Sequence, residues 1–121
     1  MLTLYGIPNC DTCRKARRWL DQRGADFRFH DLRADGIDAA RITAWLQHVP
    51  AERLVNRRST SWRQMDAGQR AAADGDDVAA LLAAHPTLIK RPLLETADTC
   101  LVGFHVSDWA AAVPEAGASS A

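Results

Sequence analysis

The spacing of apolar residues in the first 32 residues restricts the fold of the chain, because it changes from the pattern of a strand to that of a helix and back. Residues 2–5 form an apolar run that stops at a glycine and a proline, which is typical of a short buried strand. Apolar residues then recur at helical spacing until Gly24, and residues 26–32 alternate as a second strand would. A strand, a helix and a strand at this spacing predict a βαβ unit with parallel strands and a right-handed crossover.

The sequence pattern in the middle of the chain predicts mainly helices. Asp38 is placed to cap a helix whose apolar stripe ends near Pro50. Residues 51–65 are less regular and rich in arginine, serine and threonine, whereas residues 76–84 have the pattern of a further helix. These segments predict a helical insertion after the βαβ unit.

The C-terminal part predicts a hairpin and a last helix. Residues 88–94 and 99–102 have the character of two strands joined by a polar turn, which favours antiparallel pairing. Either Ser107 or Asp108 is placed to cap the last helix. The whole order predicts an α/β fold, namely a thioredoxin-like sheet with a helical insertion between the N-terminal βαβ unit and a C-terminal ββα unit.

The length and composition fit one globular domain. The chain has 121 residues and no formal net charge, with 47% hydrophobic and 25% charged residues. We expect one domain over residues 1–114 and a flexible tail over residues 115–121. The lack of a basic excess argues against direct nucleic-acid binding. All basic residues except Lys15 and Lys90 are arginines, which suits oxyanion binding, although a GC-rich genome produces the same bias.

The sequence also indicates the cellular compartment in which the protein works. No stretch approaches the ~20 apolar residues of a membrane span, and the N-terminus lacks the basic and long apolar regions of a signal peptide. We therefore expect a cytoplasmic protein without a membrane partner, in a compartment where thiols stay reduced. We also expect a monomer.

The cysteines suggest redox chemistry rather than a metal site or a disulfide framework. Cys10 and Cys13 form a C-x-x-C, which is either half of a zinc site or a redox pair. No second pair follows, and the four histidines match no zinc-finger spacing, so we expect no metal. Cys100 falls in a predicted strand, where a buried structural thiol is expected.

The predicted position of Cys10 favours a reactive thiolate. A thiol just before a helix faces unpaired backbone N–H groups and the positive end of the helix dipole, and both lower its pKa. Cys13 follows one helical turn later, close enough to attack a mixed disulfide formed on Cys10. The alternative is that both cysteines are inert small hydrophobic residues.

A second candidate element is the segment around Pro92. In thioredoxin-like sheets a cis-proline lies opposite the reactive cysteine, and if Pro92 is that residue, Arg91 lies beside Cys10. Arg91 then stabilises the thiolate and holds an anionic group of the substrate. The alternative is a trans proline at the start of a strand.

A third element is the arginine-rich segment of residues 53–63. Its arginines are interleaved with Asn56, serines, a threonine and a tryptophan, and they suit an oxyanion or the carboxylates of glutathione. Within it, Asn56, Arg57 and Arg58 are the candidates for substrate contact, together with Asn9 and Thr12 beside the C-x-x-C. The alternative is a solvated loop.

These elements carry a resemblance to a known family. The stretch TLYGIPNCDTCRKARRWL resembles the strand, active-site cysteine and first helix of the arsenate reductase (ArsC)/Spx family. The stretches FRFHDLRADGID, LVNRRSTSWRQMD and HPTLIKRPLL are most similar to the YffB-like branch of that family. The resemblance covers residues 2–113, and the family's thioredoxin-like fold with a helical insertion agrees with the predicted one.

The resemblance implies roles for single residues. Cys10 corresponds to the family's nucleophile, and Arg91 to one of three arginines that cradle arsenate in glutaredoxin-coupled reductases. The first arginine falls at or beside Asn56, and the third is replaced by Gly103. Because two or fewer arginines bind a tetrahedral oxyanion less well than three, the resemblance favours a glutathione-dependent thiol reductase of the YffB type. Glutathione is then a co-substrate, glutaredoxin a further partner, and no cofactor is bound.

Two alternatives come from the same family. Spx proteins carry a C-x-x-C where this chain has Cys10 and Cys13, use it as a redox switch, and regulate transcription by binding RNA polymerase. A regulator that binds the α-subunit of RNA polymerase is therefore one alternative. The other is an arsenate reductase that uses glutathione and glutaredoxin.

Overall fold

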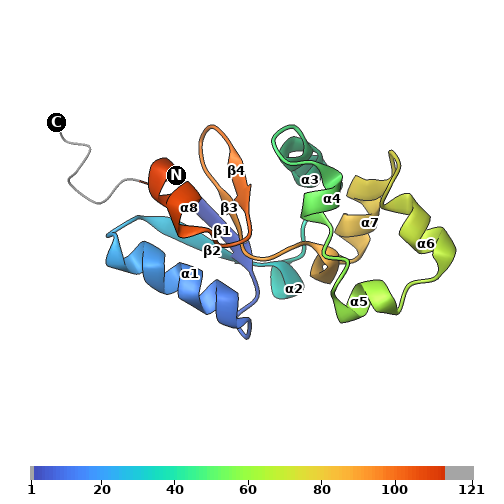
Figure 1. The fold of residues 1–121 in the computed structure, drawn as a ribbon, viewed down its shortest axis with the longest axis horizontal. Helices are drawn as coiled ribbons and strands as arrows, with labels where there is room; N and C mark the ends of the chain where they lie inside the picture. The colour runs from blue at the N-terminus through green and yellow to red at the C-terminus, as the bar shows by residue number, and fades with distance from the viewer. Residues whose placement is uncertain (1, 114–121) are drawn as a thin grey trace. The chain divides into compact units, whose positions relative to one another are not determined.

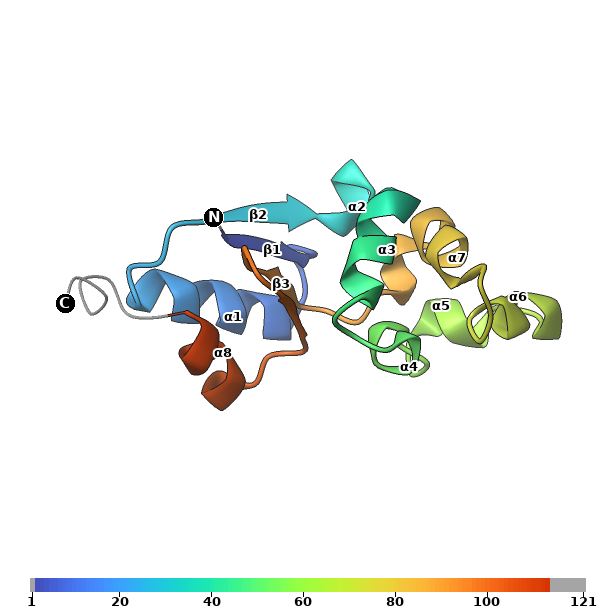
Figure 2. The same cartoon turned by 90° about the horizontal axis from the view of Figure 1, so that it is seen from above.

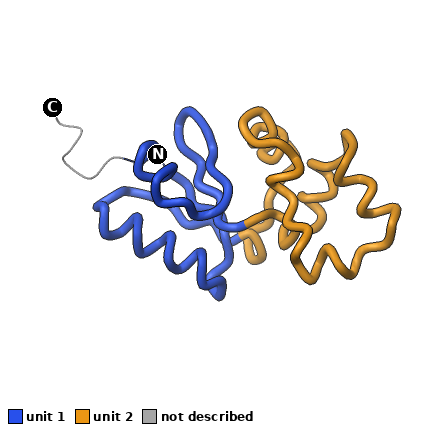
Figure 3. The backbone as a smooth tube through the Cα atoms, viewed as in Figure 1, with its two compact units in different colours: residues 1–31, 91–121 blue, residues 32–90 orange. Residues whose placement is uncertain are grey.

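The computed structural model describes residues 2–113, and the chain divides into two compact units (Figure 3). Unit 1 is formed by residues 1–31 and 91–121, and unit 2 by residues 32–90. The expectation of one domain over residues 1–114 stays a prediction. The tail expected over residues 115–121 lies outside the described residues.

Unit 1 is built on a mixed four-stranded sheet in the order β2-β1-β3-β4 (Figure 1). The strands are β1 (Leu2–Gly6), β2 (Phe27–Asp31), β3 (Leu93–Glu95) and β4 (Cys100–Val102). The first two strands pair in parallel across helix α1 (Asp11–Gln22), which confirms the predicted βαβ unit. The last two form the predicted antiparallel hairpin, and β3 also runs antiparallel to β1.

Helices α1 and α8 (Val106–Ala112) cover the same face of this sheet (Figure 2). Their contact with the sheet is apolar, and its buried members are Leu4, Ala16, Leu20, Leu94, Trp109 and Val113. The indole of Trp109 is fully buried and donates a hydrogen bond to the carbonyl oxygen of Gly103 at 3.0 Å. This bond secures α8 to the turn that follows β4.

Two predicted boundaries in unit 1 are wrong. The last helix is capped at His105 rather than at Ser107 or Asp108, because the N–H of Trp109 already donates to the carbonyl of His105 at 3.0 Å. The first strand of the hairpin begins at Leu93, not at residue 88. Residues 86–88 form a short 3-10 helix, and Ile89 pairs with Val55 in an isolated bridge instead.

Unit 2 is helical, as the insertion was predicted to be. Its helices are α2 (Leu32–Asp35), α3 (Ala39–Leu46), α4 (Ala51–Leu54), α5 (Thr60–Arg63), α6 (Ala67–Ala72), α7 (Val78–Ala84) and the 3-10 helix η1 (Pro86–Leu88). Helices α3 and α7 pack together. Asp38 caps α3 by accepting the N–H of Arg41 at 2.8 Å, as predicted.

The short helices of unit 2 differ from the sequence-based expectation. Residue 32 was expected to end a strand, but Leu32 begins α2 and is fully buried. Residues 51–65, for which the sequence predicts no regular element, contain α4 and α5. Helix α6 begins with a capping box in which Asp66 accepts the N–H of Gln69 and the Gln69 side chain accepts the N–H of Asp66.

The sheet order, the helices on one face and the insertion are those of a thioredoxin-like α/β fold, which confirms the predicted class. Within residues 2–113, no helix is long and apolar enough to cross a membrane.

Candidate functional site

The loop between β1 and α1 presents Cys10 at the first turn of the helix. Cys10 is the N-cap residue of α1, with an extended backbone at φ −102° and ψ 122°. Its N–H donates to the carbonyl of Ile7 at 3.3 Å, and its carbonyl accepts the N–H of Arg14 at 2.9 Å. The side chain is partly exposed, so Cys10 meets solvent where the helix dipole is positive.

The surroundings of Cys10 favour its thiolate. Burial of the thiol acts to raise its pKa, but several neighbours act in the opposite direction. The backbone N–H and the thiol of Cys13, the N–H of Thr12 and the charge of Arg91 all favour the negative form. These effects outweigh burial, so the pKa of Cys10 lies below that of an ordinary thiol.

Cys13 has the opposite character, although it lies only three residues later. Its side chain is fully buried, and burial raises its pKa to about 11. Within that net shift, the hydrogen bond and negative charge of Cys10 also act to raise the pKa of Cys13, whereas the N–H of Ile7 and the charge of Arg91 act to lower it. One sulfur of the pair is therefore partly exposed with a lowered pKa, and the other is buried and protonated.

Gly6 allows this burial. An ideal Cβ on Gly6 would lie 2.6 Å from the Sγ of Cys13 and 3.3 Å from its Cβ. The last residue of β1 must therefore lack a side chain for α1 to approach the strand so closely. The C-x-x-C pattern did not reveal this requirement, because nothing in it points to Gly6.

Arg91 and Pro92 enter from the segment before β3. The peptide bond between them is cis, so of the two alternatives for Pro92 the structure shows the cis one. Pro92 is buried, and its carbonyl accepts the N–H of Gly103 at 2.8 Å. The half-buried Arg91 is close enough for its charge to lower the pKa of both Cys10 and Cys13. The structure thus brings together three of the predicted site residues, Cys10, Cys13 and Arg91.

Asn9 and Thr12 are both exposed and flank Cys10 in sequence. Arg14, a basic residue of the first turn of α1, makes contacts on both sides of Cys10. The guanidinium of Arg14 donates to the carbonyl of Pro8 at 3.2 Å and pairs with the carboxylate of Asp11 at 3.1 Å. Arg14 therefore ties the loop before Cys10 to the first residue of α1. A basic residue three positions after an acid on a helix is the signal that could have indicated this pair.

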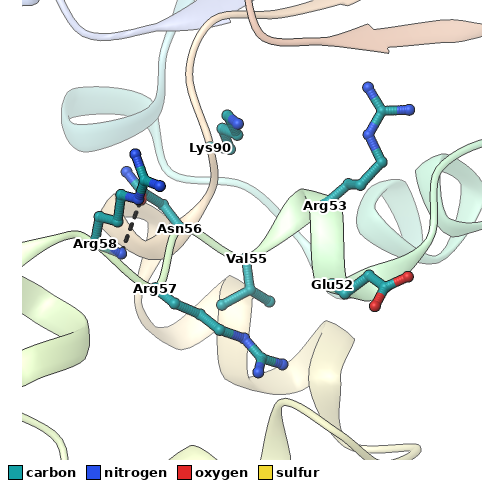
Figure 4. Close-up of a pocket in the computed structure, with 7 residues that line it drawn as sticks. All are labelled: Glu52, Arg53, Val55, Asn56, Arg57, Arg58 and Lys90. Atoms are coloured by element: carbon teal, nitrogen blue, oxygen red, sulfur yellow. Dashed lines mark hydrogen bonds between the residues drawn. The ribbon is translucent and has the colours of Figure 1, made fainter.

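Asn56, Arg57 and Arg58 lie in unit 2, on the segment that follows α4. They line a pocket of about 430 Å³ together with Glu52, Arg53, Val55 and Lys90 (Figure 4). The three predicted residues differ in their partners. Arg57 pairs with Asp74 at 2.8 Å and lies over the ring of Trp62, whereas the Oδ1 of Asn56 accepts the backbone N–H of Arg58 at 3.1 Å.

Comparison with known proteins decides the family. A sequence model of the ArsC family matches residues 5–112. The chain belongs to the ArsC family. An uncharacterized protein of Haemophilus influenzae is 39% identical over 112 residues, which cover 93% of this chain and 98% of that protein.

Two further ArsC-type relatives bear on function. The solved structure of a YffB protein matches this chain with a TM-score of 0.85 at 40% identity, covering 93% of this chain and 99% of the other. The global transcriptional regulator Spx of Streptococcus pyogenes is 27% identical over 107 residues, which cover 87% of this chain and 79% of the regulator. Both branches named by the resemblance are therefore found among the relatives.

Gly103 marks where this ArsC-family chain lacks an arginine that the resemblance would place there. Gly103 has a left-handed backbone with φ +77°. Its N–H donates to Pro92, and its carbonyl accepts the indole of Trp109. The position therefore contributes a backbone turn rather than a charge.

The third cysteine lies apart from the C-x-x-C chemistry. Cys100 is buried in β4, as expected. Its burial, together with the charge of Glu95, its partner on β3, raises its pKa to about 11. Among residues 2–113, no group of three or more histidine, cysteine, aspartate or glutamate side chains could hold a metal ion.

Proposed function

We propose that this ArsC-family protein is a glutathione-dependent thiol–disulfide oxidoreductase that works in the reducing cytoplasm. The observation that carries the proposal is the Cys10 thiol at the start of α1, with its pKa lowered and Arg91 beside it. A partly exposed sulfur that ionises easily is the usual nucleophile of such enzymes. The buried Cys13 one turn later is consistent with a redox pair.

The first step is an attack by the Cys10 thiolate on one sulfur of a substrate disulfide. A bond forms between Cys10 and that sulfur, the substrate S–S bond breaks, and the second substrate sulfur leaves as a thiolate that takes a proton from water. Arg91 favours the attacking thiolate and binds an anionic group of the substrate. Asn9 and Thr12 contact the substrate on either side of Cys10.

The second step removes the mixed disulfide, by one of two routes. Either Cys13 or the thiolate of glutathione attacks the Cys10 sulfur and releases the reduced substrate. The attack by Cys13 leaves a Cys10–Cys13 disulfide, which two glutathione molecules reduce. The attack by glutathione leaves a Cys10–glutathione disulfide, which a second glutathione or a glutaredoxin reduces. Each route transfers two electrons from thiols to the substrate disulfide.

The environment of Cys13 bears on this choice. Two of the causes that raise its pKa, the hydrogen bond and the charge of Cys10, disappear once Cys10 is in a neutral disulfide. Burial, the largest cause, remains. Cys13 is therefore a better nucleophile in the intermediate than in the reduced protein, but its burial still favours the glutathione route.

The rate of Cys10 alkylation against pH tests the nucleophile. We expect a midpoint below 8.5 for the natural protein and a higher midpoint for Arg91→Ala, because the charge that favours the thiolate is removed. The matched control is Lys15→Ala, which removes an exposed charge of α1 that is not among the groups shifting the pKa of Cys10. A midpoint near 8.5 that Arg91→Ala leaves unchanged would contradict the proposal.

Turnover of hydroxyethyl disulfide with glutathione tests the reaction and its route. We expect turnover that depends on Cys10 and on glutathione, with mass spectrometry detecting a Cys10–glutathione adduct in the Cys13→Ala variant. If Cys13→Ala is inactive, Cys13 resolves the intermediate and the glutathione route is wrong. If the natural protein shows no turnover, the oxidoreductase proposal fails.

Similarity to Spx favours a second candidate, a redox-dependent regulator that binds the α-subunit of RNA polymerase. Spx relatives are transcriptional regulators by name, and this chain contains the Cys10–Cys13 pair that such a switch requires. A pull-down with purified α-subunit, with and without oxidant, tests it, and no capture in either state would exclude it. Arsenate reduction is less favoured because Gly103 supplies no charge, and absence of arsenate turnover with glutathione and glutaredoxin would exclude it.

A further inference from the structure

Helix α1 carries a group of arginines that begins one turn after the reactive cysteine. Its 12 residues contain four basic and two acidic side chains, although the whole chain has no net charge. The N–H of Arg14 donates to the carbonyl of Cys10 at 2.9 Å, and residues 14, 17, 18 and 21 then share one side of the helix. We call this side the arginine face of α1. It is lined by Arg14, Arg17, Arg18 and Asp21, around an open hollow of about 360 Å³.

The fold occupies the three arginines of this face to different degrees. Arg14 ties the loop before Cys10 to α1, but its side chain is still 56% exposed. The guanidinium of the half-buried Arg17 lies 4.3 Å from the ring centroid of Phe29, which holds it in place. Arg18 is exposed and, within residues 2–113, makes no hydrogen bond, ion pair or ring contact. The face therefore combines positioned guanidinium groups with one that is available to a ligand.

The order of the charges along α1 does not stabilise the helix itself. Anions stabilise the N-terminal end of a helix and cations its C-terminal end. Asp11 follows this rule, but the four basic residues lie at positions 14–18, and the last turn contains Asp21 and no basic residue. The cation at that end is the C-cap residue Arg23, which donates to the carbonyl of Val113 at 2.9 Å. Basic residues that gain nothing from the helix dipole are better explained by a ligand that approaches from solvent.

The spacing along the helix matches that of an extended peptide. A helix rises about 1.5 Å per residue, so Arg14 and Arg18 lie ~6 Å and ~12 Å beyond Cys10 along the axis of α1. An extended peptide advances ~3.3 Å per residue, so these spans correspond to roughly two to four residues. Guanidinium groups bind carboxylates through charge-assisted hydrogen bonds. Arg18 lies beyond the reach of the carboxylates of a tripeptide disulfide held at Cys10, but within the reach of a longer peptide.

We propose that the substrate disulfide is carried by a peptide segment with acidic residues about two to four positions from its cysteine, and that the arginine face of α1 binds these residues. The inference rests on the proposed thiol–disulfide exchange at Cys10 and names the substrate class for it. Attraction to the face steers an acidic segment toward the thiolate, and salt weakens this attraction. A small neutral disulfide has no carboxylates and gains nothing from the face.

The rate of a single exchange step tests this inference without turnover of glutathione. Peptides of equal length carry one cysteine in a disulfide with 2-thiopyridine, and the positions near that cysteine hold aspartates in the first peptide, asparagines in the second and lysines in the third. The Cys10 thiolate attacks the peptide sulfur, so that a Cys10–peptide disulfide forms and the bond to the pyridine sulfur breaks. The released pyridine thiolate takes a proton from water, and its absorbance follows the reaction.

The expected rates depend on charge and on salt. The aspartate peptide should react roughly tenfold faster than the asparagine peptide at low ionic strength, the lysine peptide should be the slowest, and about 1 M salt should remove most of the difference. Arg18→Gln should slow the aspartate peptide roughly two- to fivefold and leave the asparagine peptide and oxidised glutathione unchanged. The matched control is Arg28→Gln. It removes an exposed arginine that alternates with Phe27 and Phe29 and so lies on the sheet face opposite α1, and it should change no rate.

Other outcomes would overturn the inference, and they separate it from the proposed function. Equal rates for the three peptides would leave thiol exchange in place and remove the role of the arginine face. If Arg91→Ala abolishes the preference for aspartate and Arg18→Gln does not, the carboxylates bind at Arg91 instead. If Arg18→Gln slows oxidised glutathione as much as the aspartate peptide, the face serves a tripeptide and not a longer segment. Absence of release from every peptide would overturn the thiol exchange at Cys10 and this inference with it.

Discussion

The two units of the chain hold their candidate chemistry in different ways. In unit 1 the proposed reaction depends on the sulfur of Cys10. Its pKa is set by its own burial, by backbone N–H groups, by a buried partner thiol and by one guanidinium. In unit 2 the candidate site consists of several cations that line one pocket. A site of the first kind is lost with one atom, whereas a site of the second kind weakens in steps. Substitutions in unit 1 should therefore have larger effects than substitutions in unit 2.

The largest effect is expected for Cys10→Ser. A hydroxyl cannot replace the thiolate as nucleophile, so disulfide turnover with glutathione should fall by roughly a thousandfold or more. The control is Cys100→Ala, which removes a thiol that lies in β4 and takes no part in the proposed reaction. Steady-state assays of the two variants measure the difference. Comparable losses in both would show that the cysteines act through stability and not through chemistry.

Gly6→Ala should destabilise the protein by about 1–3 kcal/mol, as overpacked core substitutions do. The new Cβ would lie 2.6 Å from the Sγ of Cys13, so α1 must shift. Gly75→Ala is the control, because no atom lies within 4 Å of a Cβ placed there. Urea unfolding measures both.

The same substitution in a Cys13→Ala background sharpens the result. There the conflicting sulfur is absent, so the loss of stability caused by Gly6→Ala should become smaller. An unchanged loss would place the conflict elsewhere in the fold.

The free energy of unfolding should fall as pH rises from about 8.5 to about 11. The pKa of Cys100 is raised to about 11 in the folded protein, whereas an exposed thiol in the unfolded chain ionises near 8.5. The unfolded state therefore loses its proton first, which favours unfolding between those two values. Urea unfolding at several pH values, compared with Cys100→Ala, isolates the contribution. If both proteins have the same pH dependence, the thiol is not held protonated.

The smallest effect is expected in unit 2, for Asp38→Ala. The Asp38 carboxylate accepts an N–H of α3 at 2.8 Å, and removal of such a cap costs about 1 kcal/mol. Asp77 lies at the same position of α7 but makes no such bond, so Asp77→Ala should change stability little. Equal effects in the two variants would show that charge near the helix start, and not the hydrogen bond, stabilises these helices.

The sequence predicted unit 1 better than unit 2, for a physical reason. A buried strand and a 12-residue helix contain enough apolar positions for their period to be recognised, so residues 2–31 were assigned nearly to the correct boundaries. Helices of four to six residues contain barely more than one turn, so α2, α5 and α6 have no period to detect. Their capping residues were the available signal, above all the pair Asp66 and Gln69.

The candidate site shows the same limit. The C-x-x-C indicated Cys10 and Cys13, and the segment around Pro92 indicated Arg91 as their neighbour on the condition that the proline is cis, which it is. Arg57 and Asp74 pair although they are 17 positions apart, and no local sequence pattern predicts this pair. Likewise, the hydrogen bond from the N–H of Lys90 to the carbonyl of Leu54 arises from tertiary folding. Sequence patterns thus indicated candidates that lie in recognisable motifs, including Arg91 next to its proline, and missed contacts between segments that carry no motif.

The left-handed backbone of Gly103 limits which residues can replace it during evolution. An arginine there would have to adopt a left-handed backbone, which is disfavoured by roughly 1 kcal/mol or more for a residue with a side chain. It would also disturb the turn that joins Pro92 to the anchor of α8. A third arginine at this position would therefore be gained only together with a loss of stability. A route toward an arsenate clamp that avoids this loss rebuilds the turn first.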